Sequence, residues 1–198
     1  MPDEVRHGLR EALKTVAVAL KAVGVPFALA GGYGLWARGG PEPDHDVDFI
    51  VAEDDAPRVM ERLAEHGLQV VQPPEDWLFK VFIGSGPAQP AMVDVLYRSA
   101  GSPVTRRHFE GVDELEVESV AMPVLSATTL MIDKMLAMEE HACNLSAALP
   151  AARAVREQVE WDRVRHAVAD NPYASAFLYL LDRLRIADQP GARVRGAG

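Results

Sequence analysis

The chain has 198 residues, of which 48% are hydrophobic and 25% charged, and its formal net charge is −9. This composition is ordinary for a globular protein, and the negative charge argues against a nonspecific nucleic-acid coat protein. No apolar run reaches the roughly 18 residues of a membrane span, and the charged N-terminus is unlike a signal peptide. The single cysteine, Cys143, excludes an internal disulfide and fits a reducing compartment, so we expect a cytoplasmic protein.

The first 125 residues alternate patterns that are typical of helices and of strands. Apolar residues three and four positions apart predict an amphipathic helix from about residue 3 to residue 23. Short apolar runs, and one run that alternates apolar with acidic residues, predict the strands. The expected strands cover residues 27–30, 47–52, 68–71, 77–84, 91–97 and 115–124, and further helices are expected at 31–38 and 57–66.

The remainder of the chain has helical patterns only. It follows Ser126, a candidate N-cap, and we expect two or three helices up to about residue 186, with breaks near Leu149–Pro150 and at 170–172. The sequence therefore predicts an α/β (α+β) domain with a mixed sheet over 1–125, a helical C-terminal domain over 126–188 and a disordered tail over 189–198. Residues 1–150 carry 12 Lys/Arg against 23 Asp/Glu, and residues 151–198 carry 8 against 6, which leaves room for a local nucleic-acid contact.

Three aspartates lie inside or at the entry of apolar strand-like runs: Asp46, Asp48 and Asp94. A buried unpaired carboxylate costs several kcal/mol, so each needs a partner or a cation. Residues two apart in a strand project to the same face, so Asp46 and Asp48 point the same way and repel each other unless a cation lies between them. A third carboxylate from a neighbouring strand would complete an oxygen-rich cup suited to Mg²⁺. Two such ions can clamp the oxygens of a phosphoryl transfer.

A glycine pair, Gly31 and Gly32, lies where the first strand meets the next helix. Glycines at such a junction let backbone N–H groups approach a phosphate closely. Each motif is weak alone, because a turn glycine and a chance Asp-x-Asp are both common. Their combination in this order favours a nucleotide-binding site that includes a bound metal ion.

The segment GGYGLWARGGPEPDHDVDFIV resembles the DNA polymerase beta-like nucleotidyltransferase superfamily, and more narrowly its AbiEii-like branch. The matching residues are Gly31, Gly32, Leu35, Arg38, Asp46, Asp48 and Phe49. The branch includes toxins of toxin–antitoxin pairs, among them MenT-type toxins that add nucleotides to the acceptor end of tRNA. The superfamily also resembles enzymes that adenylylate antibiotics.

The resemblance implies two further residues in the helical part. Lys134 fits the branch's helical lysine and would bind the triphosphate, and Asp162 fits its later acidic residue, although Glu157 and Glu160 lie close by. Arg38 either binds phosphate or pairs with a nearby aspartate. Lys80, inside WLFKVFIG, is expected to be an edge-strand residue that reaches solvent.

These residues lead to a hypothesis of Mg²⁺-dependent nucleotidyl transfer. Asp46 and Asp48 bind two Mg²⁺ that hold an NTP, Asp94 shares the second ion and helps deprotonate the acceptor hydroxyl, and Lys134 offsets the charge of the leaving pyrophosphate. By resemblance the acceptor is the tRNA 3′ end, and the protein is a toxin with a cognate antitoxin. An antibiotic nucleotidyltransferase is the alternative, and an inert binding module with this fold is a third.

Overall fold

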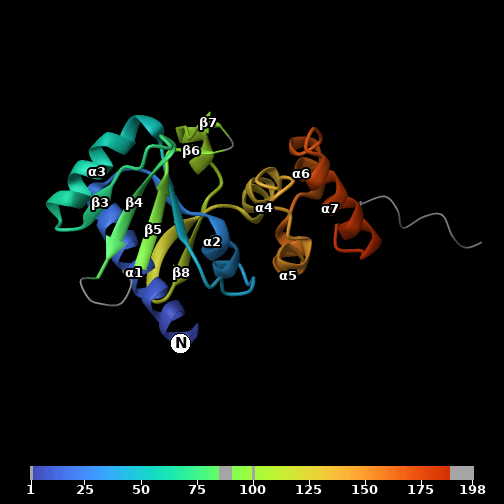
Figure 1. The fold of residues 1–198 in the computed structure, drawn as a ribbon, viewed down its shortest axis with the longest axis horizontal. Coiled ribbons are helices and arrows are strands. Elements are labelled where there is room, and N and C mark those ends of the chain that lie inside the picture. The colour runs from blue at the N-terminus through green and yellow to red at the C-terminus, as the bar shows by residue number, and fades with distance from the viewer. Residues whose placement is uncertain (1, 85–90, 100, 188–198) are drawn as a thin grey trace, which may run out of the picture. The chain divides into compact units, whose positions relative to one another are not determined.

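The computed structural model describes residues 2–84, 91–99 and 101–187, so the tail expected over 189–198 lies outside the described residues. The chain divides into two compact units, which Figure 1 shows in chain order by colour. The first unit comprises Met1–Ala37 and Glu42–Leu125, and the second comprises Arg38–Pro41 and Ser126–Gly198.

The first unit is built on a mixed seven-stranded sheet with the strand order β3-β4-β5-β2-β1-β9-β8 (Figure 1). β2 runs parallel to β5 and β1 runs parallel to β9, whereas the other neighbouring strands are antiparallel. The strands of the sheet are β1 (Phe27–Leu29), β2 (Val47–Val51), β3 (Gln69–Val71), β4 (Leu78–Ile83), β5 (Ala91–Leu96), β8 (Asp113–Val117) and β9 (Val120–Val124). A separate two-stranded ribbon is formed by β6 (Arg98–Ser99) and β7 (Ser102–Pro103).

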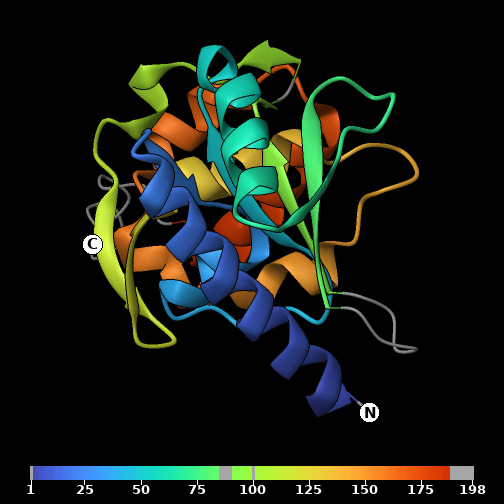
Figure 2. The same cartoon turned by 90° about the vertical axis from the view of Figure 1, so that its left-hand side faces the viewer.

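Two helices cover one face of this sheet, as Figure 2 shows for α1 (Pro2–Val23) and α3 (Ala56–Glu65). The apolar positions of α1 that the sequence pattern predicts, including Leu13, Val16 and Leu20, are completely buried against the strands. A third helix, α2 (Gly31–Ala37), packs on β2. Two 3₁₀ turns, η1 (Glu53–Asp55) and η2 (Arg106–Phe109), complete the unit.

One strand prediction is wrong. The run 115–124 is not a single strand but a hairpin of β8 and β9, which pair in antiparallel register. Glu118 and Ser119 form its two-residue turn with φ values of 49° and 64°. Positive φ at both turn positions matches the right-handed twist of the two strands, and it is unusual for residues other than glycine. The sequence pattern of alternating residues continued through the turn and concealed it.

The second unit contains four helices among its described residues, α4 (Ala127–Leu136), α5 (Leu145–Val155), α6 (Trp161–Ala167) and α7 (Pro172–Arg183), with a 3₁₀ turn, η3 (Arg156–Gln158), after α5. The Ser126 hydroxyl accepts a hydrogen bond from the Thr129 N–H at 3.1 Å, so the predicted N-cap is confirmed. Asn171 caps α7 in the same way, directly before Pro172. None of the helices in the described ranges has both the length and the apolar character of a membrane span.

The predicted break near Pro150 is wrong, because Pro150 lies inside α5. A proline here removes the hydrogen bond to the carbonyl four residues earlier, at Ser146. Both residues are exposed, so water can bind that carbonyl and the helix continues. The break falls instead between α4 and α5, where the Asn144 side chain accepts from the Ala147 N–H at 3.0 Å and begins α5. These changes give four helices where two or three were expected.

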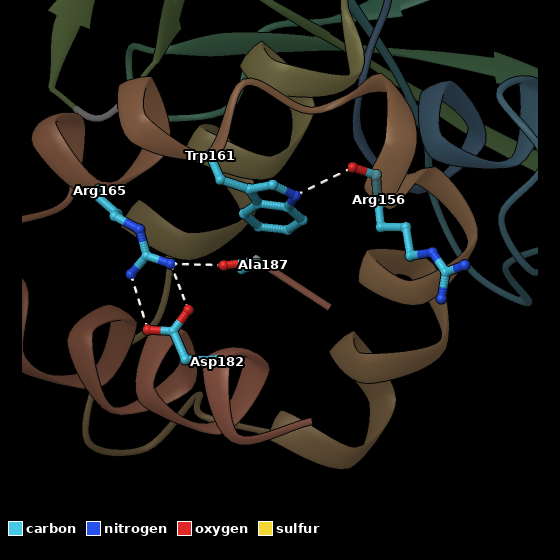
Figure 3. A network of polar contacts seen from close by, with 5 residues as sticks. All are labelled: Arg156, Trp161, Arg165, Asp182 and Ala187. Atoms are coloured by element: carbon cyan, nitrogen blue, oxygen red, sulfur yellow. Dashed lines mark hydrogen bonds and ion pairs between the residues drawn. The ribbon is translucent and has the colours of Figure 1, made fainter. Parts of the chain in front are cut away.

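Polar contacts connect the helices of the second unit (Figure 3). The guanidinium of Arg165 on α6 donates to both carboxylate oxygens of Asp182 on α7 and, at 2.8 Å, to the Ala187 carbonyl. The Trp161 indole N–H donates to the Arg156 carbonyl at 3.1 Å. The first of these networks holds α6 to α7 and to the chain that follows α7.

Candidate active site

A row of three charged side chains crosses the middle of the sheet. Lys80 on β4 is the cross-strand partner of Asp94 on β5, and Asp94 is the partner of Asp48 on β2. Their neighbours in each strand, such as Phe49 and Val95, are completely buried in the core. Since side chains alternate between the two faces of a strand, the charged row lies on the face opposite the α1 core.

Gly31 and Asp48 fit together through the backbone and the side chain. The Ala30 N–H donates to the Asp48 carbonyl at 2.9 Å, which places the start of α2 beside β2. A Cβ atom added to Gly31 would lie 2.7 Å from the Asp48 carboxyl carbon and closer still to Oδ2. Gly31 also has a φ of +55°, a conformation that side chains disfavour. The glycine turn and the aspartate are therefore parts of one local arrangement.

The Asp48 carboxylate is half-buried, and no donor among the described residues hydrogen-bonds to it. Burial, together with the charges of Asp94 and Asp46, raises the pKa of Asp48 to about 6. The positive charges of His45 and Lys80 oppose this shift only in part. Asp46 itself is exposed and directly precedes β2. The local field therefore favours a bound cation, which would relieve the repulsion between the carboxylates.

Asp94 differs from Asp48 because it has a cationic partner. The Lys80 ammonium lies 2.9 Å from Asp94 Oδ1 and 3.2 Å from Oδ2. Burial raises the pKa of Asp94, whereas the hydrogen bond and the charge of Lys80 lower it. The expectation that Lys80 is an edge-strand residue reaching solvent is wrong, since β3 forms the edge and Lys80 faces Asp94. A charge within the apolar run WLFKVFIG was the signal that could have identified it.

The predicted cup of three carboxylates is not assembled as a ligand set. Within residues 2–84, 91–99 and 101–187, no group of three or more His, Cys, Asp or Glu side chains is placed to hold a metal ion. Asp94 is engaged by Lys80, whereas Asp48 has an uncompensated carboxylate beside Asp46. The donor chemistry of Asp46 and Asp48, two hard carboxylates with mutual repulsion, fits Mg²⁺.

The other predicted site residues are placed as follows. Gly32 lies in the first turn of α2, and a Cβ there would approach Pro43 at 3.2 Å. Arg38 is half-buried, and its carbonyl accepts from the Gln158 side chain at 2.9 Å. Lys134 is half-buried on α4, and Asp162 is exposed in the first turn of α6. Arg38, Lys134 and Asp162 belong to the second unit.

Comparison with known proteins relates this mixed α/β sheet to the nucleotidyltransferase fold. The family described as aminoglycoside-2″-adenylyltransferase matches residues 12–101, which is just under half of the chain and includes the whole charged row. This match relates residues 12–101 to the nucleotidyltransferases and supports the prediction of a nucleotidyltransferase enzyme. No curated protein matches the chain in a sequence search.

Solved structures of known proteins show the same fold. The crystal structure of ANT(2″)-Ia in complex with adenylyl-2″-tobramycin has a TM-score of 0.60 at 13% identity, covering 86% of this chain and 97% of that one. An antigenic nucleotidyltransferase-like protein from Paracoccidioides brasiliensis has a TM-score of 0.51 at 12% identity, covering 90% and 89%. The predictions of a mixed α/β fold and of a nucleotidyltransferase enzyme are confirmed at this level. The AbiEii-like branch has no support from these comparisons.

Proposed function

We propose that the protein transfers a nucleoside monophosphate from an NTP to a hydroxyl group with the help of Mg²⁺. The observation that carries this proposal is the fit of Gly31 against the uncompensated Asp48 carboxylate. An uncompensated half-buried carboxylate is unfavourable for folding alone and becomes useful when a cation binds beside it, and a glycine at position 31 keeps the space next to it open.

In this mechanism Asp46 and Asp48 hold Mg²⁺, and the turn at Gly31 and Gly32 leaves space for the phosphates. Bound Mg²⁺ supplies positive charge that stabilises the charge developing on the reacting phosphate. Asp94 accepts the proton of the acceptor hydroxyl, whose oxygen then bonds to the α-phosphorus as the bond to pyrophosphate breaks. Lys134 is proposed to bind the leaving pyrophosphate, and Arg38 and Asp162 are proposed to act in binding the substrates.

We propose a small polycationic acceptor of the aminoglycoside type. The family match over residues 12–101 supports it, and so does the charge of residues 1–150, which have 12 Lys/Arg against 23 Asp/Glu. An acidic surface attracts a cationic drug and repels RNA phosphates. This reverses the order of acceptors that the sequence favoured, and a cognate antitoxin is not part of this proposal.

Transfer to the tRNA 3′ end, by a toxin with an antitoxin partner, is the second candidate function. It is supported by the resemblance of the segment from Gly31 to Phe49 to the AbiEii-like branch. The two candidates share the aspartates and the metal, so only the acceptor distinguishes them.

One experiment tests the reaction and the acceptor together. The protein is incubated with Mg²⁺ and each labelled NTP, in one series with tobramycin and in another with total tRNA, and the products are separated by chromatography and gel electrophoresis. We expect label on tobramycin. Label on tRNA alone would select the second candidate, and no label in either series with any of the four NTPs would contradict both candidate functions.

Matched variants attribute the transfer to the site. Asp46→Asn and Asp48→Asn remove proposed ligands with little change in volume, and we expect each to reduce transfer by about a hundredfold to a thousandfold. Asp44→Asn is the control, because Asp44 is an exposed aspartate two residues before Asp46. Equal activity of Asp48→Asn and Asp44→Asn would contradict the proposed metal site.

A further inference from the structure

The Lys80–Asp94 pair is unusual because the reaction scheme requires Asp94 but assigns no role to Lys80. Lys80 contacts both oxygens of Asp94, at 2.9 and 3.2 Å, and their side chains are only 26% and 13% exposed. The register of β4 on β5 places Lys80 directly opposite Asp94 on one face of the sheet. The lysine side chain is therefore held within reach of the carboxylate, while its flexible end can still move away.

The charges along the row set how many cations the site can hold. Asp46, Asp48 and Asp94 contribute three negative charges, and Lys80 contributes one positive charge at the Asp94 end. The remaining two negative charges lie at the Asp46–Asp48 end, where no donor among the described residues neutralises Asp48. A single divalent cation matches this balance, whereas a second ion beside Asp94 would meet the ammonium group of Lys80.

We propose that Lys80 is a positioning residue that takes the place of a second metal ion at Asp94 until the nucleotide binds. The site without nucleotide then holds one divalent cation, between Asp46 and Asp48. A second ion reaches Asp94 only when the triphosphate adds its own negative charge and the ammonium of Lys80 is displaced from the carboxylate. This inference rests on the proposed function, since it refines how the same carboxylates bind metal.

The pair also has a role in folding. Without Lys80 the carboxylates of Asp48 and Asp94 would lie opposite each other on adjacent strands without this compensating charge, and like charges on neighbouring strands destabilise a sheet. Before the nucleotide binds, Lys80 neutralises Asp94 and leaves the carboxylates of Asp46 and Asp48 for the cation. The nucleotide-free protein can therefore fold with a single metal ion or with none.

The test counts Mn²⁺ ions, which substitute for Mg²⁺ and are visible by electron paramagnetic resonance. Mn²⁺ is titrated into the full chain with and without α,β-methylene ATP, an analogue whose α–β bridge resists transfer. We expect one Mn²⁺ per chain without the analogue and two with it. In Lys80→Met we expect the second Mn²⁺ to bind without the analogue, with an affinity at least about tenfold higher than in the wild type.

Four variants make this result specific. Lys80→Gln keeps an N–H donor for Asp94 without the charge and should behave like Lys80→Met, whereas Lys80→Arg should bind one ion. Lys14→Met removes a lysine from α1, where Lys14 pairs with Glu11, and controls for the change in net charge. Adding Asp94→Asn to Lys80→Met should abolish the second site. Circular dichroism establishes that each variant is folded.

Two outcomes separate the inference from the proposed function. The proposed role of Lys80 would be contradicted if the wild type binds two Mn²⁺ without nucleotide. It would also be contradicted if Lys80→Met and Lys80→Gln bind the same number of Mn²⁺ ions as Lys14→Met. Nucleotidyl transfer can still be measured in either case. If no variant binds Mn²⁺ even with the analogue, the proposed metal-dependent function fails, and the inference fails with it.

Discussion

A half-buried charge is balanced by a partner at Arg165 in the helical unit but is left uncompensated at Asp48 in the sheet unit. In the helical unit, Arg165 donates to both oxygens of Asp182 and to the Ala187 carbonyl, so the charge of each side chain is balanced within the unit. In the sheet unit, Asp48 is half-buried beside Asp46 and Asp94 without a donor among the described residues. A charge balanced internally stabilises a fold, whereas an unbalanced one destabilises it until a ligand binds. This difference supports the proposed metal site at Asp46 and Asp48 in the sheet unit.

Among the variants that test the surroundings of Asp48 without removing its carboxylate, the largest effect is expected for Gly31→Ala. The new Cβ would overlap the Asp48 carboxylate and would hold a side chain at a φ of +55°. Asp48 must move, and a displacement of about 1 Å at a reacting group can reduce the rate about a hundredfold. We expect nucleotidyl transfer, measured as kcat/KM, to fall by at least about that factor.

Gly67→Ala is the matched control for this variant. Gly67 has a φ of +81° after α3, but a Cβ there meets no atom within 4 Å. It therefore introduces backbone strain without a clash, and transfer should remain close to that of the wild type. Equal losses of transfer in the two variants would mean that strain, and not the contact with Asp48, accounts for the effect.

The pH dependence of stability tests the uncompensated charge directly. Burial first, and then Asp94 and Asp46, raise the pKa of Asp48 from 3.8 to about 6 in the folded protein. Because the folded state holds this proton more tightly than the unfolded state, the contribution of Asp48 lowers stability as the pH rises from about 4 to about 6. We expect a loss of up to about 3 kcal/mol in metal-free protein, measured by urea unfolding in EDTA.

Asp48→Asn should remove this part of the pH profile and should be more stable than the wild type above pH 6. Saturating Mg²⁺ should reduce the difference between the two proteins, because the cation binds the ionised carboxylate of the wild type. A wild-type profile that matches Asp48→Asn between pH 4 and 6 would show that Asp48 is already compensated.

In the helical unit, removal of a charge should have the opposite effect on stability. Asp182→Ala leaves the Arg165 guanidinium without its carboxylate, and we expect the free energy of unfolding to fall by about 1–2 kcal/mol. Glu160→Ala provides the control, since the Glu160–Arg163 pair is long, at 3.7 Å, and highly exposed. Urea unfolding of both variants at pH 7 should show a loss for Asp182→Ala only. A gain in stability for Asp182→Ala would contradict the contrast between the units.

The smallest effect is expected at the start of the helical unit. Ser126→Ala removes the oxygen that accepts from the Thr129 N–H, and loss of such an N-cap lowers stability by about 1 kcal/mol. Ser175→Ala, on the exposed surface of α7, should change stability little. Thermal unfolding of the two variants measures the difference in stability. Equal unfolding temperatures would show that the Ser126 cap does not stabilise the unit.

Local patterns in the sequence predict much of the sheet unit. The spacing of Leu13, Val16 and Leu20 indicates α1 because a helix presents these positions on one face. The apolar run after Asp46 indicates β2. Because neighbouring side chains of a strand point to opposite faces, the apolar Phe49 is expected to face the core and Asp48 the other side. The hairpin turn at Glu118 and Ser119 has no glycine or asparagine, so local chemistry gave no sign of it.

The amino-acid sequence by itself determined that a glycine pair, two neighbouring aspartates and a third aspartate in a later strand follow one another in an order that resembles nucleotidyltransferases. Only the tertiary structure decided which of these groups meet. The order β4-β5-β2 sets Lys80 against Asp94 and Asp94 beside Asp48, and the second of these pairs joins strands that α3, β3 and β4 separate in the sequence. Such pairing depends on sheet register, which is set by the packing of the whole core and not by the residues near each charge.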